Sequence, residues 1–543
     1  VKPPLSKQEI EHFEKSEFKK IKQPSKKGKT SKQFKPGKRK LSGNAVLIIT
    51  EKPQAAAKIS AALSDGNAKS YSGGQGVSYY EFEKQGQEII VSCAVGHLFS
   101  LSQNIKGSDY PIFDIGWKPN FEVRKKDFTR KYYNNLSKLI KRAKEIIIAT
   151  DYDVEGEVIG YNIVRFIGGQ EDAKRMKFSS LTAEDIKHSY NNLSPTINWG
   201  HAIAGETRHY LDWYYGINLS RALMNSIKSS GKFKIMSIGR VQGPALNLIV
   251  EREKEIQAFK PETFWRVFIN VVDKKDPKNE LELKHTKDLT DKKELEKFEK
   301  LKNKEADVST NKSEQIIPPP VPFDLTTLQT ESYKFFSITP VKTLQIAQQL
   351  YLSGVISYPR TSSQKIPQSI NPKNILKRLS SSFKKEVEIA TRNEPIEGSK
   401  LDPAHPSIYP TGEFQELGED EKKIYDLIAR RFIACFCQDA KIENKTITAE
   451  VDKLKFKARG VEIKEKAWMD VYKTKLQEVE LKDMNGKAII KEVRIQEDQT
   501  KPSKRYSPAS IISELEKRGL GTKATRANIV ETLYNRNYVS DNR

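Results

Sequence analysis

Four acidic residues follow two short apolar segments of the chain: Glu51, Asp151, Asp153 and Glu155. The first acid follows AVLIIT (45–50), and the other three follow EIIIAT (145–150). If both segments are strands of one parallel sheet, their carboxyl ends meet at the edge where such sheets bind ligands. Alternating carboxylates at a strand-to-helix turn suit Mg²⁺, which prefers oxygen ligands. The alternative is that 151–157 forms only an acidic helix cap and first turn.

A tyrosine beside a proline and an arginine is the second candidate for chemistry. In VISYPRTSS (355–363), Pro359 favours an extended backbone at Tyr358, so that Tyr358 and Arg360 project to the same side. A phenol can attack a phosphodiester, but its free pKa of ~10 keeps it protonated at neutral pH unless a proton acceptor or positive charge is near. Arg360 can stabilise the charge that develops on the phosphate. The alternative is an ordinary packing role, since the chain has 21 tyrosines.

The elements that must position these residues follow from apolar periodicity. Continuous apolar segments at 45–50, 88–93 and 145–150 are typical of buried strands in a parallel sheet. Helical patterns follow the first and the third segments. Strands that alternate with helices predict an α/β domain over 45–195.

Beyond that domain, helical and β-like patterns alternate along the chain. We expect helical segments at 196–260, 323–442 and 498–543, and β-rich segments at 261–322 and 443–497. This order suggests nested insertions, in which one β-rich hinge domain and one helical domain are each assembled from two separated segments. The prolines at 318–320 mark a hinge. The predicted fold class is therefore multidomain, α/β plus α+β.

The charge of the chain points to a polyanionic partner. Its 543 residues include 94 Lys and Arg against 70 Asp and Glu, a net charge of +24 that favours nucleic acid. Residues 1–44 carry 14 basic and four acidic residues, and we interpret them as a disordered arm that is either merely solvated or contacts phosphates. No apolar run approaches the ~20 residues of a membrane span. Because Cys93, Cys435 and Cys437 are too few for a disulfide framework or a zinc ribbon, we expect a cytoplasmic chain without zinc.

Several segments resemble one known family. TEKP and ATDYDVEGE are similar to the Toprim fold, the metal-binding domain shared by type IA topoisomerases and primases, and ISYPRTSS resembles the nucleophile motif of type IA topoisomerases. Four further segments resemble motifs of that family in its order: RHYLDWYYGINLSRAL (208–223), SIGRVQGPAL (237–246), AHPSIYPTG (404–412) and KRGLGTKATRANIVETLYNRNYV (517–539). The resemblance implies domains arranged as a torus. The resemblance is nearest to the archaeal and topoisomerase III members of the family, because a lysine follows Glu51 directly. It also leads us to expect that the last helical segment is truncated.

The resemblance implies a role for each candidate residue. Tyr358 would attack DNA and Arg360 would hold the phosphate, while Glu51, Lys52 and His405 would move protons or contact the phosphate. Mg²⁺ would be bound by four carboxylates, those of Glu51, Asp151, Asp153 and Glu155. DNA contacts are implied for nine residues: Arg208, Asp212, Asn218, Arg221, Arg240, Gln242, Thr522, Thr525 and Arg526. Without the resemblance, each of these residues has an ordinary alternative. His405 can be a structural residue, Arg240 can be a cation that caps a helix, and Arg208 and Arg221 can lie on solvated helix faces. Thr522, Thr525 and Arg526 can be the capped start of a helix.

The implied activity is ATP-independent relaxation of negatively supercoiled DNA, by a transient 5′-phosphotyrosyl break in one strand, strand passage and religation. No G-x-x-x-x-G-K-[ST] segment occurs, so no ATP is expected. The implied partners are single-stranded and negatively supercoiled DNA, with a helicase or single-strand-binding protein as a further candidate, and the chain itself is expected to be a monomer. Two other classes stay open: a primase or nuclease that uses the carboxylates without Tyr358, and a non-catalytic single-strand binder.

Overall fold

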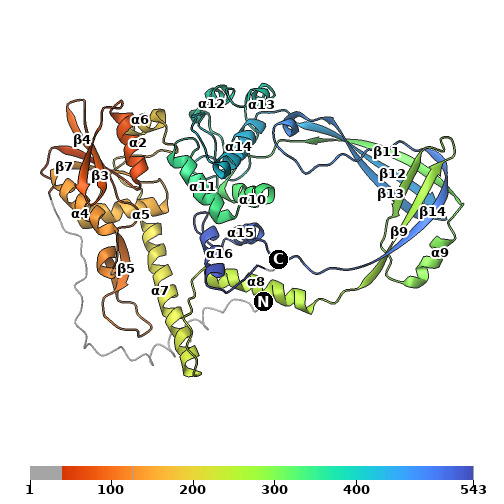
Figure 1. The fold of residues 1–543 in the computed structure, drawn as a ribbon, viewed down its shortest axis with the longest axis horizontal. Helices are drawn as coiled ribbons and strands as arrows, with labels where there is room; N and C mark the ends of the chain where they lie inside the picture. Colours follow the sequence, from red (N-terminus) through yellow and green to blue (C-terminus); the bar gives the residue numbers. More distant parts are fainter. Residues whose placement is uncertain (1–39, 125, 542–543) are drawn as a thin grey trace, which may run out of the picture.

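The computed structural model describes residues 40–124 and 126–541. Almost all of the predicted basic arm (1–44) therefore lies outside the described residues. The described chain forms a sheet-containing body, a tyrosine-bearing helical body, a smaller helical body and a β-barrel (Figure 1). In the described part of the chain, every helix is too short or too polar to cross a membrane.

A six-stranded sheet with the order β2-β3-β4-β1-β7-β8 forms the core of the first body. Its strands are β1 (Ala45–Thr50), β2 (Lys69–Gly74), β3 (Val77–Lys84), β4 (Gln87–Cys93), β7 (Ala143–Ala149) and β8 (Lys174–Arg175). Strand β1 pairs in parallel with both β4 and β7, and all of its residues are buried. The predicted parallel core is thus confirmed, and it places the carboxyl ends of β1 and β7 side by side.

Helices cover both faces of this sheet because successive residues of β1 point to opposite sides. Val46 and Ile48 pack in the cluster that includes α2 (Pro53–Leu63) and α6 (Ala183–Asn191). Leu47 and Ile49 pack in the cluster that includes α4 (Thr129–Leu139) and α5 (Val154–Ile163). A small ribbon, β5 (Phe99–Gln103) with β6 (Ile115–Pro119), and the short helix α3 (Asn120–Val123) complete this body.

The outer strands β2 and β3 depart from the parallel arrangement and pair antiparallel. Tight turns join β2 to β3 and β3 to β4, and both residues of the second turn, Gln85 and Gly86, have positive φ. A two-residue turn of this kind returns the chain beside itself, so only antiparallel pairing is possible there. The sheet is therefore mixed, with a parallel centre and an antiparallel edge.

A closed six-stranded barrel is built from two separated stretches of the chain, in the order β10-β13-β12-β11-β14-β9. The first stretch supplies β9 (Thr263–Asp273), β10 (Glu280–His285), the short helix α9 (Glu296–Glu299) and β11 (Glu305–Ile317). The second supplies β12 (Ala440–Val451), β13 (Leu454–Glu465) and β14 (Gly486–Gln499). Closure leaves no free sheet edge, and the barrel lies at the opposite end of the molecule from the sheet (Figure 1).

Helices inserted between the two barrel stretches form the tyrosine-bearing body. They are α10 (Leu325–Phe336), α11 (Pro340–Leu352), α12 (Pro372–Leu379), α13 (Lys384–Glu388) and α14 (Glu419–Ala434). Helix α11 begins with Pro340 in its first turn, and Thr339 caps it by accepting from the Lys342 N–H. A Gly354 turn with positive φ ends the helix and leads into the tyrosine segment.

The last body is formed by α8 (Gln242–Ala258), α15 (Pro508–Lys517) and α16 (Arg526–Asn535), which share one core, whereas α7 (Trp199–Ser229) packs on α5 of the first body. Helix α8 leads into the barrel, whereas α15 follows the barrel's last strand. Because α15 packs on α10 and α16 on α11, the barrel, the tyrosine-bearing body and this body close into a ring of domains (Figure 1). This arrangement agrees with the predicted torus.

Helix α7 packs closely on α5 through a glycine, which makes a direct test of this contact possible. A Cβ at Gly205 would lie 2.3 Å from Val158 Cγ2, so Gly205→Ala should destabilise the protein by about 1–3 kcal/mol through overpacking. The matched control on the same helix is Gly216→Ala, where the nearest atom is 3.9 Å away and better helix propensity should stabilise by ~0.5–1 kcal/mol. Urea unfolding measures both, and an unchanged free energy for Gly205→Ala would contradict the close packing.

Candidate active site

The carboxyl ends of β1 and β7 form an acidic edge, as their parallel pairing requires. Lys52, the second residue after β1, places its Nζ 3.1 Å from Glu51 Oε1 and 2.8 Å from Asp151 Oδ2. The Asp151 backbone is held by Arg175, a fully buried residue whose Nη2 donates to the Asp151 carbonyl at 3.0 Å. Gly156 is required beside it, because a Cβ there would lie 2.0 Å from the same carbonyl oxygen. The loop that carries the acids is therefore rigidly positioned.

Asp153 is both a helix cap and a member of the candidate site, the two interpretations that the sequence left open for the acidic segment. It is the N-cap of α5, and its side chain accepts from the Gly156 N–H at 2.8 Å. Its other carboxylate oxygen accepts from Tyr358 Oη at 2.6 Å. The cap thus orients a carboxylate towards the tyrosine.

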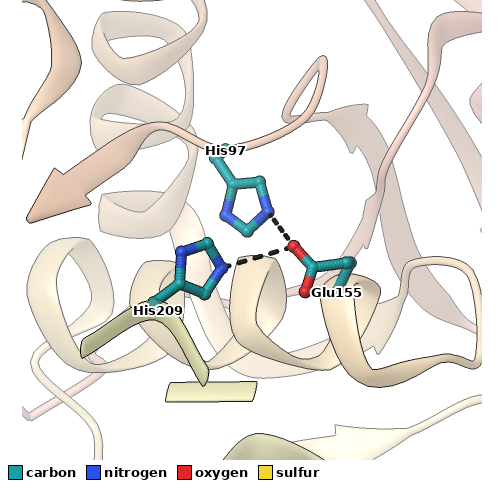
Figure 2. Close-up of side chains that lie close together, drawn as sticks. All are labelled: His97, Glu155 and His209. Carbon is teal, nitrogen blue, oxygen red and sulfur yellow. Dashed lines mark hydrogen bonds and ion pairs between the residues drawn. The ribbon is translucent and has the colours of Figure 1, made fainter. Parts of the chain in front are cut away.

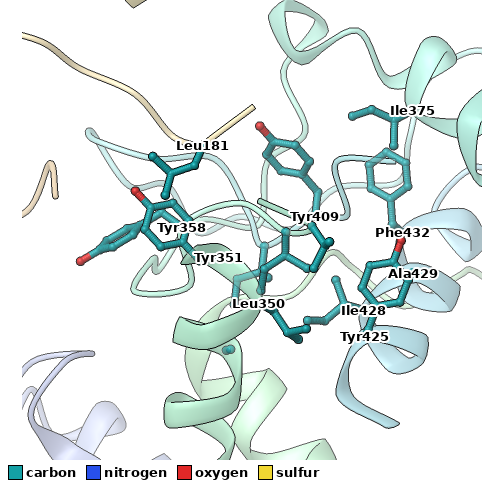
Figure 3. Packing of buried hydrophobic residues seen from close by; sticks show 14 of the residues in the cluster. Leu181, Leu350, Tyr351, Tyr358, Ile375, Tyr409, Tyr425, Ile428, Ala429 and Phe432 are labelled. Atoms are coloured by element: carbon teal, nitrogen blue, oxygen red, sulfur yellow. The ribbon is translucent and has the colours of Figure 1, made fainter. Parts of the chain in front are cut away.

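Tyr358 reaches the acidic edge across a junction between two bodies. Its backbone N–H donates to the Ser179 carbonyl at 2.8 Å, which docks the extended tyrosine segment on the first body. Arg360 Nη1 lies 3.8 Å from the same Asp153 oxygen that accepts the phenol. Figure 3 shows Tyr358 at the margin of a buried cluster, near Leu181, with its hydroxyl directed away from the aliphatic side chains. The structure therefore brings Tyr358, Arg360 and Asp153 together.

Burial and charge shift the proton affinities of this group. Burial and the Asp153 carboxylate raise the pKa of Tyr358 well above that of a free phenol, so its proton stays on the hydroxyl in this state. Burial and the Asp151 charge raise the pKa of Glu51 to about 7. Glu51 can consequently give or take a proton near neutral pH.

His405 lies against the tyrosine ring, with 4.6 Å between the ring centroids. Its Nε2 is 2.9 Å from the Tyr152 carbonyl oxygen, which only accepts, so the proton is on Nε2. Nδ1, 3.0 Å from Ser179 Oγ, then accepts from that hydroxyl. Burial lowers the pKa of His405 to about 4, and the neutral imidazole bridges the same junction as Tyr358.

Two further groups join the site without having been predicted. Tyr351 Oη lies 3.5 Å from Asp151 Oδ1, and its ring packs 5.2 Å from that of Tyr358. In the sequence, Tyr351 lies on the apolar face of a helix one turn before Gly354, a position that indicates only packing. Asp402, near His405, is paired with Lys523; burial opposes its ionisation, but the Lys523 charge outweighs this and lowers the pKa of Asp402 to about 2. That ion pair links the tyrosine-bearing body to the segment before α16.

Glu155 departs from the predicted four-carboxylate metal site. Its carboxylate is paired with Arg208 and lies 3.0 Å from His97 Nε2 and 3.3 Å from His209 Nε2 (Figure 2). Among the described residues, no three of the four predicted acids bring ligand atoms within 4.8 Å of one another. Glu155 lies in the first turn of α5, where Arg208 and His209 of α7 contact it, whereas Asp153 caps the helix and faces Tyr358.

The remaining acids still suit a hydrated magnesium ion. Mg²⁺ keeps several waters and needs only one or two protein carboxylates, which Asp151 and Asp153 offer. The Lys52 ammonium between Glu51 and Asp151 shows that this edge already attracts positive charge. The donor set therefore fits Mg²⁺ without a closed cage of protein ligands.

Most of the predicted DNA-contacting residues line one surface hollow of about 310 Å³. They are Arg208, Asp212, Arg240, Gln242, Thr522 and Thr525. Arg240 Nε lies 3.0 Å from Asp212 Oδ1, and the Thr522 and Thr525 hydroxyls are 3.1 Å apart. The hollow thus joins α7, the segment before α8 and the segment before α16, as an extended ligand would require.

The other three predicted DNA contacts bind the protein itself. Asn218 donates to the Ile112 carbonyl and accepts from its N–H, and Arg221 donates to the Asp109 carbonyl at 2.8 Å. Both therefore fix the loop between β5 and β6 on α7. Arg526 is 9% exposed and donates to the Leu520 carbonyl at 3.0 Å. Their contacts in this structure are structural.

Comparison with known proteins gives consistent matches. The family model described as DNA topoisomerase matches residues 196–543, and that described as Toprim domain matches residues 46–181. The chain is 45% identical to DNA topoisomerase 1 of Methanocaldococcus jannaschii over 91% of this chain and 66% of that protein. It is also 45% identical to DNA topoisomerase 1 of Pyrococcus horikoshii, over 91% and 74%. The chain thus spans between about two thirds and three quarters of the length of these relatives.

A solved structure has the same arrangement. Full-length topoisomerase I from Thermotoga maritima superposes with a TM-score of 0.70 at 26% sequence identity, covering 92% of this chain and 79% of that one.

The burial of neutral His405 predicts an acid-sensitive junction. The pKa of His405 falls from 6.5 to about 4 on folding, so the unfolded chain takes up a proton at this residue before the folded chain does. The stabilisation from burying the neutral imidazole is therefore complete above pH ~6.5 and is lost as the pH drops towards about 4. The loss should be about 3 kcal/mol. We expect the melting temperature of the wild type to fall more steeply over this range than that of His405→Gln, whose side chain does not titrate. Parallel curves for the two proteins would refute this account.

Proposed function

The chain belongs to the type IA DNA topoisomerases, and we propose that it breaks and reseals one strand of DNA through Tyr358 without ATP. The observation that carries this proposal is the 2.6 Å hydrogen bond from Tyr358 Oη to Asp153, with Arg360 3.8 Å from the same oxygen. A nucleophile, a proton acceptor and a cation for the phosphate are thus within reach of one another. A nuclease or primase would not need the tyrosine.

In the proposed cleavage, Tyr358 Oη attacks a backbone phosphorus while the bond from phosphorus to the 3′ oxygen breaks. The phenolic proton passes to Asp153, and the DNA 5′-phosphate becomes esterified to the tyrosine. Arg360 neutralises charge on the non-bridging oxygens. One phosphate ester replaces another, so the 3′-hydroxyl can reverse the reaction without an external energy source.

Glu51 is the proposed proton donor to the leaving 3′ oxygen. Its pKa of about 7 keeps a substantial protonated fraction at neutral pH, and an acid poised near the working pH is the most effective catalyst in both directions. Lys52 holds Glu51 beside Asp151 and contributes positive charge near the phosphate. In religation, the carboxylate form of Glu51 would take the proton back from the 3′-hydroxyl.

A bound Mg²⁺ would supply Lewis-acid charge to position the broken ends for religation. Asp151 and Asp153 are the residues that would hold it. Glu51 adds a third carboxylate to this edge, and Lys52 and Arg360 balance part of the negative charge.

Strand passage is proposed to require separation of the tyrosine-bearing body from the first body. Opening would break the bond from the Tyr358 N–H to Ser179, the bond from the Tyr358 hydroxyl to Asp153 and the contacts of His405 with Ser179 and Tyr152. The barrel, joined to the rest of the ring by two pairs of segments, is the proposed hinge. The hollow lined by six of the predicted DNA-contacting residues is the proposed path for single-stranded DNA. The proposed substrate is negatively supercoiled cytoplasmic DNA, and the chain is proposed to act as a monomer.

Tyr358→Phe tests the proposed nucleophile. The variant should form no covalent adduct with a 5′ end of DNA and should not relax a plasmid, while its affinity for single-stranded DNA stays unchanged. Tyr409→Phe is the matched control, because Tyr409 is buried in the same core (Figure 3) and should keep the adduct. Denaturing gels of labelled oligonucleotides measure it. An adduct that persists in Tyr358→Phe would identify another nucleophile, and free nicks without adduct would indicate a nuclease.

The raised pKa of Glu51 predicts the pH dependence of cleavage. If its protonated form donates to the leaving oxygen, the single-turnover cleavage rate should fall above pH ~7, by up to about tenfold per unit. Glu51→Gln should lower the rate by about 10²–10⁴-fold and abolish this slope. Glu280→Gln, on the exposed side of the barrel strand β10, should retain it. A slope that survives in Glu51→Gln would assign the acid elsewhere.

A further inference from the structure

The buried carboxylate of Asp402 ties together the two segments that carry candidate reacting groups. Its Oδ2 accepts from the Ser362 N–H at 3.1 Å and from the Ser362 hydroxyl at 3.0 Å. Its Oδ1 accepts from the Ala404 N–H at 3.0 Å. Ser362 follows Tyr358 by four residues in the tyrosine segment, and Ala404 directly precedes His405 in what we call the histidine segment. Asp402 therefore fixes the backbones of these two segments relative to each other.

The cation that pairs with this carboxylate comes from a different body. Lys523 Nζ contacts Asp402 Oδ2, the same oxygen that holds Ser362. Lys523 lies in the turn before α16, whereas Asp402 belongs to the tyrosine-bearing body. The two bodies are neighbours, since α15 packs on α10 and α16 packs on α11 (Figure 1). The ion pair is therefore a charged contact between them.

The turn that carries Lys523 also lines the DNA hollow. Thr522 and Thr525 line that hollow, while the lysine between them points to Asp402 instead. Two hydrogen bonds close the turn, from the Thr522 N–H to Thr525 Oγ1 at 2.9 Å and from the Thr525 N–H to the Thr522 carbonyl at 3.0 Å. The place of the lysine is consequently set by the same turn that would meet the DNA strand.

Asp402 depends on Lys523 because its carboxylate is buried. The Asp402 side chain is 2% exposed and that of Lys523 is 26% exposed. Burial opposes ionisation of Asp402, and the charge of Lys523 outweighs it, so that the pKa of Asp402 is lowered to about 2. Removing the cation would leave a buried charge without its partner, which costs far more than the loss of a surface ion pair. The carboxylate that holds Ser362 and Ala404 is thus itself held by Lys523.

A second ion pair between the same two bodies offers an internal comparison. Lys400 Nζ, in the tyrosine-bearing body, lies 3.3 Å from Glu516 Oε2 of α15. The Glu516 side chain pairs with Lys400 and with Arg526, and not with the two segments that Asp402 holds. Loss of Glu516 should therefore affect only the docking of the bodies, whereas loss of Lys523 should also loosen the tyrosine and histidine segments.

We propose that Lys523 and Asp402 are positioning residues that hold the DNA hollow in register with Tyr358. A strand held at Thr522 and Thr525 is presented to the phenol at one fixed phosphate, because the turn, the ion pair and the tyrosine segment form one connected unit. Neither Lys523 nor Asp402 takes part in the chemistry, since both act through the segments that they hold. The inference rests on the proposed function and adds to it how the cleaved phosphate is selected.

Single-turnover cleavage of a labelled oligonucleotide at saturating concentration separates positioning from binding. Lys523→Met should lower the cleavage rate by about 10- to 100-fold, since a misplacement of ~1 Å at the reacting atoms has an effect of that size. The cuts should also spread over neighbouring phosphates, while the dissociation constant for the oligonucleotide stays unchanged. Lys523→Arg should recover most of the rate and the single cut position, because a guanidinium can restore the ion pair.

Three further variants isolate the ion pair. Glu516→Gln breaks the other pair between the same bodies, and Lys517→Met removes an exposed cation of α15; both should keep the wild-type rate and cut position. Lys523→Met combined with Asp402→Asn leaves no buried charge without a partner, which guards against unfolding. Its loss of rate should be no larger than that of Lys523→Met alone, as for two residues that act as one unit.

Each opposing result has a distinct meaning. A wild-type rate and cut position in a folded Lys523→Met would overturn the positioning role. Weaker DNA binding, with a slope of log affinity against log salt that is flatter by ~0.7, would make Lys523 a phosphate contact instead. An equal loss of rate in Glu516→Gln would assign the effect to docking of the bodies. A wild-type chain that forms no adduct would overturn the proposed function and this inference with it, so the two failures are distinguishable.

Discussion

One hydrogen bond, from the Tyr358 phenol to the Asp153 carboxylate, holds the candidate active site together. Its two residues are 205 positions apart and lie in different bodies, Asp153 in the sheet-containing body and Tyr358 in the tyrosine-bearing body. Neither body contains both groups, so the site exists only while the two are docked. The Tyr358 side chain is buried, and its burial together with the Asp153 carboxylate raises the pKa of the phenol, so that it stays protonated in this state. Any motion that separates these two bodies therefore also takes Tyr358 away from Asp153.

Charge compensation is the second constraint on this site. Glu51, Asp151 and Asp153 crowd the end of two parallel strands, and burial makes their joint ionisation costly. Burial, with the charge of Asp151 added to it, raises the pKa of Glu51 to about 7, although Lys52 and Arg360 offset part of the negative charge. The same crowding of carboxylates explains why Lys52 and Arg360 lie at this edge and why its oxygen atoms suit a divalent cation.

The fold followed largely from local pattern. Apolar runs such as 45–50 fix a buried strand in a parallel sheet, because only burial on both faces accommodates them. The alternation of helical and β-like stretches implied that separated segments join, and the barrel is indeed assembled from β9–β11 with β12–β14. Pattern did not reveal the antiparallel edge of the sheet or the closure of the barrel. Both depend on turn geometry and on pairing between strands far apart in the chain.

For the site, the sequence by itself determined which atoms could react: carboxylates at two strand ends, and a phenol and a guanidinium on one side of an extended segment. Residue type and local backbone direction are properties of a few neighbouring positions, so they can be read without a structure. Only the tertiary structure decided which partner each group meets. It turned Glu155 towards His97 and His209, added Tyr351 beside Asp151, and directed Asn218, Arg221 and Arg526 to the protein's own backbone. Such contacts arise from the packing of whole helices and bodies, which no local spacing encodes.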